Sequence, residues 1–240
     1  MKRKKENFKK MQIESYRKLA GNFDKDQKRD NRNHINKVKS ISKFLDIKKG
    51  DKVLEIGVGT GIHAKYLLEN NRVDFSFTGI DLSKDMLEES KKKLKNYKNV
   101  ELLEMDGEHL RFNHNTFDKI YISGSLHHYD NPQKGISEIL RVLKQGGKFC
   151  IMEPNYYFPT NLYPANFIPE EKNIKLMKRK NFKKWLENKN INYKMINFAY
   201  TPPFPKKLIP TYDILDKMIN KTPIIKRLSV MLFIKGEKVR

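Results

Sequence analysis

Apolar positions follow two different spacings along this chain. In residues 1–50 they recur at helical intervals, as at Val38, Ile41 and Leu45, which predicts helices. From residue 51, short apolar runs alternate with charged stretches of helical pattern, beginning with KVLEIGV and HAKYLLEN and ending with GKFCIMEP. Alternation of buried strands with amphipathic helices predicts a parallel sheet that is covered by helices on both faces.

The regular alternation stops after Pro154. The run YYFPTNLYPANFIPE is rich in proline and aromatic residues, and proline disfavours both helix interiors and central strands, so no regular element is predicted there. The later pattern predicts a helix at 179–188, a strand at 193–200, an amphipathic helix at 212–219 and a last strand at 228–235.

Two helix boundaries are predicted from capping residues. Ser83 follows the strand that ends at Asp81, and serine is a favourable N-cap. The helix at about 133–143 is expected to end at Gly146 and Gly147, because glycine is favoured at helix C-termini.

Length and composition favour a single α/β domain with additions. The chain has 240 residues, of which 38% are hydrophobic, enough to bury a core. We expect an N-terminal helical cap at residues 1–50 and a ligand-binding core at 51–155. Residues 156–240 are expected to belong to the same domain and to carry a lid or acceptor-binding insertion and a closing β-hairpin.

The charge is strongly basic, with 50 Lys and Arg against 28 Asp and Glu and a net charge of +22. Such a charge is typical of proteins that bind nucleic acid or an anionic membrane surface. An AT-rich genome would also explain abundant Lys, Asn and Ile, and the basic residues are spread over the whole chain. Both interpretations stay open, with nucleic acid as the less favoured partner.

Cysteine content and hydropathy bear on location. The single cysteine, Cys150, excludes an internal disulfide framework, and it lies in an apolar run where a core position is expected. No run approaches the ~20 apolar residues that span a bilayer, and the basic N-terminus is followed by no apolar segment. We expect a cytoplasmic protein, with peripheral attachment to an anionic membrane as a further hypothesis.

The stretch VLEIGVGTG, from Val53 to Gly61, places three alternating glycines after a predicted strand. A dinucleotide fingerprint, G-x-G-x-x-G, would need a third glycine where Ile62 stands. A phosphate-binding P-loop would need a Lys-Ser or Lys-Thr pair at fixed spacing, and none follows. Neither of these two ligand classes is therefore predicted.

What remains is a carboxylate followed by glycines, that is Glu55 with Gly57, Gly59 and Gly61, and a helix that begins near Thr60. Glycines without side chains let a ligand lie against the backbone. The carboxylate of Glu55 favours a ligand that carries positive charge.

Two further carboxylates follow predicted strands. Asp81 ends the second strand, where a carboxylate can accept hydrogen bonds from a ribose diol. Asp106 follows the third strand and could accept from an adenine amino group, with Gly107 allowing close approach. Taken singly, each acid has a plainer explanation as a surface group, a helix cap or a turn former. Ligands of open α/β sheets bind beyond the carboxyl ends of strands, so together these acids predict a cationic adenine nucleoside and require no metal.

These segments, followed by FDKIYISGSLHHYDNPQKGISEILRVLKQGGKFCIMEPN, carry a family resemblance. Over about residues 34–155 the chain resembles the class I S-adenosylmethionine (SAM) dependent methyltransferases, in particular the branch similar to ubiquinone and menaquinone-biosynthesis enzymes (methyltransferase type 11). The resemblance implies a Rossmann-like, doubly wound, seven-stranded sheet, mostly parallel with an antiparallel last strand. It implies SAM as cofactor, held by Glu55, Gly57, Gly59, Thr60, Gly61, Asp81, Leu82, Met86, Asp106, Gly107 and Ser123.

The candidate catalytic residues are His127 and His128 in SLHHYD, directly after the fourth strand. Histidine titrates near neutrality, which suits a general base. The alternative is that the pair packs the loop, because similar methyltransferases often carry LHH here without catalytic use. His34 and His63 are expected to pack beside the cofactor or against each other's helices.

We expect methyl transfer to oxygen or carbon of a small acceptor that is lipid-like or a saccharide. The aromatic residues after Tyr156 predict an apolar pocket wall, and the helix at 212–219 could lie on a membrane or in a homodimer interface. TPPF, Thr201 to Phe204, resembles the [DNS]PP[YFW] motif of DNA methyltransferases, but its first residue and its place in the chain are wrong. The alternatives are an RNA or protein methyltransferase and a non-catalytic SAM-binding module.

Overall fold

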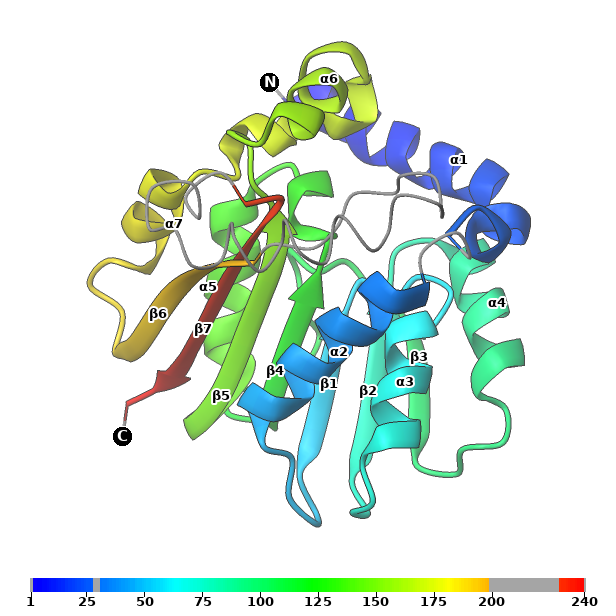
Figure 1. Ribbon diagram of the computed structural model, residues 1–240, viewed down its shortest axis with the longest axis vertical. Helices are drawn as coiled ribbons and strands as arrows, with labels where there is room; N and C mark the ends of the chain where they lie inside the picture. The colour runs from blue at the N-terminus through cyan, green and yellow to red at the C-terminus, as the bar shows by residue number, and fades with distance from the viewer. Residues whose placement is uncertain (1, 28–30, 199–228, 240) are drawn as a thin grey trace.

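A computed structural model describes residues 2–27, 31–198 and 229–239, and Figure 1 shows its seven-stranded sheet in the order β3-β2-β1-β4-β5-β7-β6. Strands β1 to β5 pair in parallel, whereas β7 is antiparallel to both β5 and β6. The predicted doubly wound sheet with a reversed last strand is confirmed. The strands are β1 (Lys52–Ile56), β2 (Ser76–Asp81), β3 (Val100–Glu104), β4 (Phe117–Ser123), β5 (Leu143–Pro154), β6 (Ile191–Phe198) and β7 (Met231–Lys238).

Helices cover both faces of the sheet and its carboxyl edge. Helices α2, α3 and α4 bury Ile41, Leu67 and Leu87 against one face, and α5 and α7 bury Ile136 and Phe182 against the other. Helices α1 and α6 lie beyond the carboxyl ends of the parallel strands (Figure 1). The helices are α1 (Lys2–Gln27), α2 (Asn31–Leu45), α3 (Ile62–Asn70), α4 (Lys84–Leu94), η2 (Leu126–His128), α5 (Pro132–Val142), α6 (Pro159–Phe167), η3 (Pro169–Leu176) and α7 (Arg179–Leu186).

Local capping explains where the helices beside the site begin. The Ser83 hydroxyl accepts a hydrogen bond from the Met86 N–H at 3.3 Å, which confirms the predicted N-cap of α4. The Asn131 side chain accepts from the Lys134 N–H, and Pro132 occupies the first turn of α5. Each such cap stabilises its helix by about 1 kcal/mol, so both helices start at defined points next to the carboxyl edge of the sheet.

The prediction that Gly146 and Gly147 end a helix is wrong. Helix α5 ends at Val142, and the glycines lie inside β5. Gly146 has φ of 72°, and a Cβ on Gly147 would lie 2.8 Å from the carbonyl oxygen of Lys144. The glycines therefore allow an irregular start of β5 that a side chain would obstruct.

The proline-rich segment also differs from its prediction, because it forms α6 and η3. Pro159 stands in the first turn of α6, where no backbone hydrogen-bond donor is needed, and Pro164 removes a single backbone bond from the helix. The strand expected at 193–200 is β6, two residues earlier, and the last strand is β7, three residues later than expected. The helix expected at 212–219 lies outside the described residues. Among the described residues, no helix is both long and apolar enough to cross a membrane.

Candidate functional site

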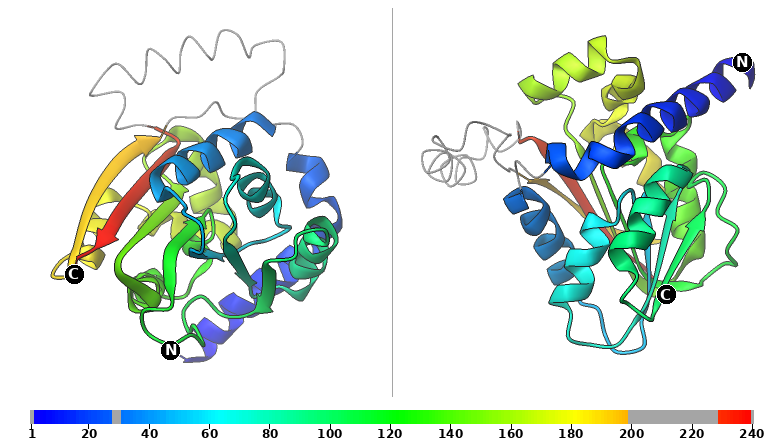
Figure 2. Two further views of the ribbon diagram at one scale, coloured as in Figure 1. Left: turned by 90° about the horizontal axis from the view of Figure 1, so that it is seen from below. Right: turned by 90° about the vertical axis from the view of Figure 1, so that its right-hand side faces the viewer.

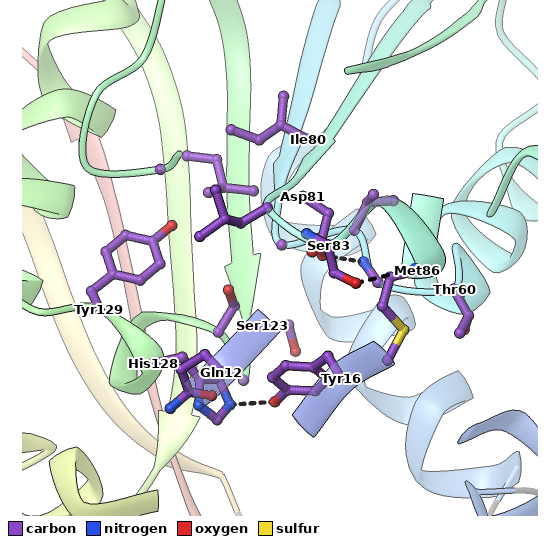
Figure 3. Close-up of a pocket in the computed structure, with 18 of the residues that line it drawn as sticks. Gln12, Tyr16, Thr60, Ile80, Asp81, Ser83, Met86, Ser123, His128 and Tyr129 are labelled. Atoms are coloured by element: carbon purple, nitrogen blue, oxygen red, sulfur yellow. Dashed lines mark hydrogen bonds between the residues drawn. The ribbon is translucent and has the colours of Figure 1, made fainter. Parts of the chain in front are cut away.

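A cavity lies at the carboxyl ends of β1, β2 and β4, beneath α1. Figure 3 shows Asp81, Ser83 and Met86 on one side of it and His128 and Tyr129 on the other. Three of the predicted site residues, Glu55, Gly61 and His127, do not line it. Those that do are Gly57, Gly59, Thr60, Asp81, Leu82, Met86, Asp106, Gly107, Ser123 and His128.

The glycine loop bends where only glycine fits easily. Gly57, Gly59 and Gly61 have φ of 74°, 54° and 77°, in the left-handed region that L-residues with side chains rarely adopt. A Cβ on Gly57 would lie 2.2 Å from the hydroxyl oxygen of Ser125. A Cβ on Gly59 would meet nothing within 4 Å, so the loop leaves open space on the cavity side of Gly59.

Asp81 ties the end of β2 to this loop. Its carboxylate accepts hydrogen bonds from the Gly59 N–H at 2.8 Å and the Ser83 N–H at 2.9 Å. Burial raises the pKa of Asp81, and the backbone N–H groups partly oppose that effect. Each carboxylate oxygen has a further lone pair, so Asp81 can still accept from ligand hydroxyls in the cavity.

Asp106 is engaged by the N-terminal helix. Lys9 of α1 lies 2.6 Å from the Asp106 carboxylate and 2.7 Å from that of Glu108. Burial raises the pKa of Asp106, but hydrogen bonds from Lys9, the Glu108 N–H and His109 lower it further, so the net shift is downward. The ion pair fixes α1 over the end of β3.

Glu55 lies in β1, two residues before the first glycine of the loop. It is 1% exposed and accepts a hydrogen bond from the Tyr121 hydroxyl at 2.7 Å. Burial raises the pKa of Glu55 to about 8, and it lowers the pKa of His63, whose Nδ1 is 3.8 Å away, well below its usual value. Neither group is held in its charged form, so this contact is not an ion pair. Direct contact of Glu55 with a ligand stays a prediction.

The expectation for His34 and His63 is confirmed. The two rings join α2 to α3 through a hydrogen bond of 2.9 Å between His34 Nδ1 and His63 Nε2, and both side chains line the cavity.

His127 is held between two carboxylates. Its Nδ1 lies 2.6 Å from Glu153, and its Nε2 lies 3.1 Å from Glu171 of η3. Burial alone would lower the pKa of His127, but the two carboxylates raise it to about 10. Ligand atoms of His127, His128 and Glu171 lie within 4.8 Å of one another, which suits a metal ion. A protonated His127, however, offers no lone pair to a metal at neutral pH.

His128 borders the cavity and contacts α1. Its Nε2 lies 2.5 Å from the hydroxyl oxygen of Tyr16 (Figure 3). Burial and the neighbouring His127 lower the pKa of His128 to about 3, and burial raises the pKa of Tyr16. His128 is therefore neutral and Tyr16 keeps its proton, so the Tyr16 hydroxyl donates to His128 Nε2.

The part of the site that sequence reasoning missed comes from α1. Lys9, Gln12 and Tyr16 line the cavity. Their spacing of three and four residues places them on one helix face, but polar residues at such spacing are also found on solvated faces. Nothing in the local pattern tells which face meets the sheet.

Comparison with known proteins agrees with this geometry. Residues 54–151 match a family described as a methyltransferase domain. The chain is 35% identical over 127 residues to a demethylmenaquinone methyltransferase of Corynebacterium kroppenstedtii, covering 53% of this chain and 50% of that protein. It is 34% identical over 115 residues to the enzyme of the same name from Staphylococcus aureus, covering 48% of each. The chain thus spans about half the length of the curated relatives it matches.

Solved structures agree in fold. A SAM-dependent methyltransferase from Thermotoga maritima superposes with a TM-score of 0.68 at 15% identity, covering 95% of this chain and 99% of that one. One from Aquifex aeolicus has a TM-score of 0.59 at 19% identity and covers 84% and 89%.

Fold, cavity and matched region define the class: residues 54–151 form a class I SAM-dependent methyltransferase domain, and SAM is the cofactor of such enzymes. Within that class the matched region is similar to the demethylmenaquinone methyltransferases, at 34–35% identity.

The residues present fit SAM. The loop leaves space beside Gly59, the Asp81 carboxylate faces the cavity, and the buried hydroxyl of Ser123 has no hydrogen-bond partner among the described residues. An unpaired buried hydroxyl is costly and suggests a ligand that satisfies it.

Proposed function

We propose that this chain transfers a methyl group from SAM to an oxygen or carbon atom of a small, apolar, aromatic acceptor. The observation that carries the proposal is the two-sided cavity. The glycine loop and Asp81 form one side, and His128 and Ser123 face them from the ends of the neighbouring strand and loop.

The cofactor would bind along the first side. Gly57 and Gly59 offer bare backbone, Asp81 accepts from ribose hydroxyls, and Leu82 and Met86 give apolar contact for the adenine. Bound SAM supplies a methyl group on a sulfonium that is already activated. The protein has mainly to align the acceptor with it, and such alignment is worth up to ~7–11 kcal/mol.

His128 would orient the acceptor. It is neutral throughout the physiological pH range because its pKa is about 3, and its Nε2 lone pair accepts the hydrogen bond from the Tyr16 hydroxyl. With that lone pair engaged and a pKa this low, His128 would position the acceptor by contact and would not take its proton. The acceptor must then release its proton readily by itself, as a phenol or an enol does and an aliphatic alcohol does not. His127, held protonated by Glu153 and Glu171, would position η2 and not act as a base.

The acceptor class follows from the relatives and from the cavity wall. The relatives are named for demethylmenaquinone, a quinone with a lipid tail. In this chain Ile13 and Phe23 of α1 and Met105 give the cavity apolar lining beyond the glycine loop. We infer that a quinone-like ring enters beneath α1.

The test is transfer of labelled methyl from SAM to an acceptor panel of demethylmenaquinone, simple naphthols and a saccharide. We expect label in the quinone or naphthol fraction, and a loss of about 10²-fold in kcat for His128→Ala with SAM affinity unchanged, because the acceptor is no longer held in line with the methyl group. Label in no acceptor, together with absent SAM binding by calorimetry, would contradict the proposal.

An RNA methyltransferase is the second candidate, favoured by the net charge of +22. It predicts RNA retention that falls steeply with salt. Labelled methyl in RNA and none in the quinone fraction would select it over the small-molecule proposal.

A further inference from the structure

Helix α6 and its flanks expose an unusual apolar surface. The described residues include eight large hydrophobic side chains that are exposed, and five of these lie between positions 157 and 168. Phe167 is 72% exposed and Tyr163 is 66% exposed, and their rings lie side by side with centroids 5.3 Å apart. We call this group the α6 surface; it consists of Tyr157, Leu162, Tyr163, Phe167 and Ile168.

The same stretch carries no charge at all. Residues 154–169 contain no Asp, Glu, Lys, Arg or His, in a chain of which 32% is Asp, Glu, Lys or Arg. Monomeric proteins rarely keep an apolar, aromatic cluster in water without a binding role. The cluster combines Tyr and Phe with aliphatic side chains, the composition found where proteins enter the interface of a membrane.

A basic segment follows the α6 surface after Pro169 and two acidic residues, Glu170 and Glu171. Residues 172–184 contain seven Lys and Arg side chains and no acidic one. Lys175 and Lys180 are exposed and form no ion pair with a described residue, whereas the Lys172 ammonium lies over the Phe8 ring of α1, 3.9 Å from its centroid. The segment starts in η3, which packs against α6. Uncompensated positive charge therefore adjoins the apolar side chains.

The α6 surface and the start of the basic segment, in η3, lie at the carboxyl edge of the sheet, the edge that holds the cavity, whereas residues 179–184 belong to α7 on a face of the sheet. Figures 1 and 2 show α6 and η3 together with α1 at the carboxyl edge of the sheet. Gln12 of α1 donates to the carbonyl oxygen of Glu170, and Glu171 reaches His127 beside the cavity. Helix η3 thus joins α6, against which it packs, to the walls of the cavity.

We propose that the α6 surface and the basic segment at 172–184 dock this protein onto an anionic lipid bilayer. The aromatic and aliphatic side chains enter the interface, and the lysines bind lipid headgroups. Burial of apolar area and the attraction of basic side chains to anionic headgroups act together in such contacts. The docking goes beyond the proposed methyl transfer and does not depend on it.

A second copy of the chain is the less favourable occupant. A twofold dimer contact would bring the same patch of both copies together, and with it two segments of seven positive charges each. That repulsion is absent on an anionic bilayer. RNA is also less favourable, because no basic residue stands between the five side chains of the α6 surface in the sequence.

Co-sedimentation of the full chain with vesicles tests the proposal. We expect binding to vesicles of phosphatidylcholine mixed with phosphatidylglycerol, and weak binding to phosphatidylcholine alone. The double variant Tyr163→Ser/Phe167→Ser is expected to bind these vesicles at least about tenfold more weakly, because two exposed aromatic groups are lost. Val73→Ser, which removes an exposed apolar residue before β2 at the opposite edge of the sheet, is the matched control and should bind like the parent.

Charge is tested separately. Lys175→Glu/Lys180→Glu should lose binding to the anionic vesicles, whereas Lys95→Glu/Lys98→Glu, between α4 and β3, should not. Methyl transfer to a water-dispersed acceptor and the thermal unfolding temperature should be unchanged in all of these variants. No vesicle binding by the parent, or equal binding by the Tyr163→Ser/Phe167→Ser variant, would overturn the proposal. The proposal would also be overturned if the Tyr163→Ser/Phe167→Ser variant lost a dimer contact or RNA binding while its vesicle binding stayed unchanged.

Discussion

His127 and Glu153 form a buried ion pair, with His127 Nδ1 lying 2.6 Å from the Glu153 carboxylate and side chains that are 5% and 0% exposed. The same carboxylate accepts hydrogen bonds from the N–H groups of Ser125 at 3.0 Å and Leu126 at 2.8 Å. One side chain at the end of β5 thus fixes η2, the turn that carries His128 into the cavity.

Glu153→Gln is therefore expected to lower the free energy of unfolding by about 3–5 kcal/mol, because it leaves a buried imidazolium with one partner fewer. Urea unfolding measures the change. The control is Glu187→Gln at the exposed end of α7, which should shift the free energy by less than about 0.5 kcal/mol. Equal effects of the two substitutions would contradict the role given to this pair.

Stability should also depend on pH through His127. Its pKa is raised from 6.5 to about 10, so between these values the folded protein holds a proton that the unfolded chain has released. The contribution is complete below pH 6.5 and is lost as pH rises towards 10. Urea unfolding at several pH values in this window should show a steeper decline for the parent than for His127→Gln. Parallel declines would argue against the shift.

Asp81→Ala should weaken SAM binding by about 1–3 kcal/mol, because a charged hydrogen-bond acceptor for the ribose is lost together with the Gly59 contact. Titration calorimetry is the measurement. Asp85→Ala, in the first turn of α4 and not among the residues that line the cavity, is a matched control that should leave affinity unchanged. Full affinity in Asp81→Ala would remove Asp81 from the binding site.

Gly57→Ala should be more damaging to folding than Gly59→Ala. Both substitutions place a side chain at positive φ, at a cost of about 1–2 kcal/mol, but at Gly57 the new Cβ also meets Ser125 at 2.2 Å. Thermal unfolding of the two variants compares them directly. In the double variant Gly57→Ala/Ser125→Gly the contact is removed and part of the stability should return. No return would mean that the contact is not what destabilises the single variant.

The sequence predicted the core of the fold because buried strands and amphipathic helices have different apolar spacings. The positions of Asp81 and Asp106 followed for the same reason, since Asp81 is the last residue of β2 and Asp106 comes two residues after β3, and both strands are recognisable in the sequence. Gly146 and Gly147 were misread because glycine serves both a helix end and an irregular strand, and only the neighbouring strand β4 distinguishes the two uses.

Long-range contacts are what the sequence could not provide. Lys9 reaches Asp106 across 97 positions and Tyr16 reaches His128 across 112. Neither pairing has a local signature, because it depends on how α1 crosses the finished sheet. Glu55 is a further example. Its place in a strand could be predicted from the sequence, but the hydrogen bond that it accepts from the Tyr121 hydroxyl could not.

Strand β7, although last in the chain, lies between β5 and β6. While a ribosome is still making residues 231–238, β6 has no neighbour to pair with and β5 presents an open edge. The nascent protein therefore cannot close its sheet until these residues have left the exit tunnel, and a message cut short before Met231 would yield a chain in which β6 has no partner and β5 keeps an open, aggregation-prone edge.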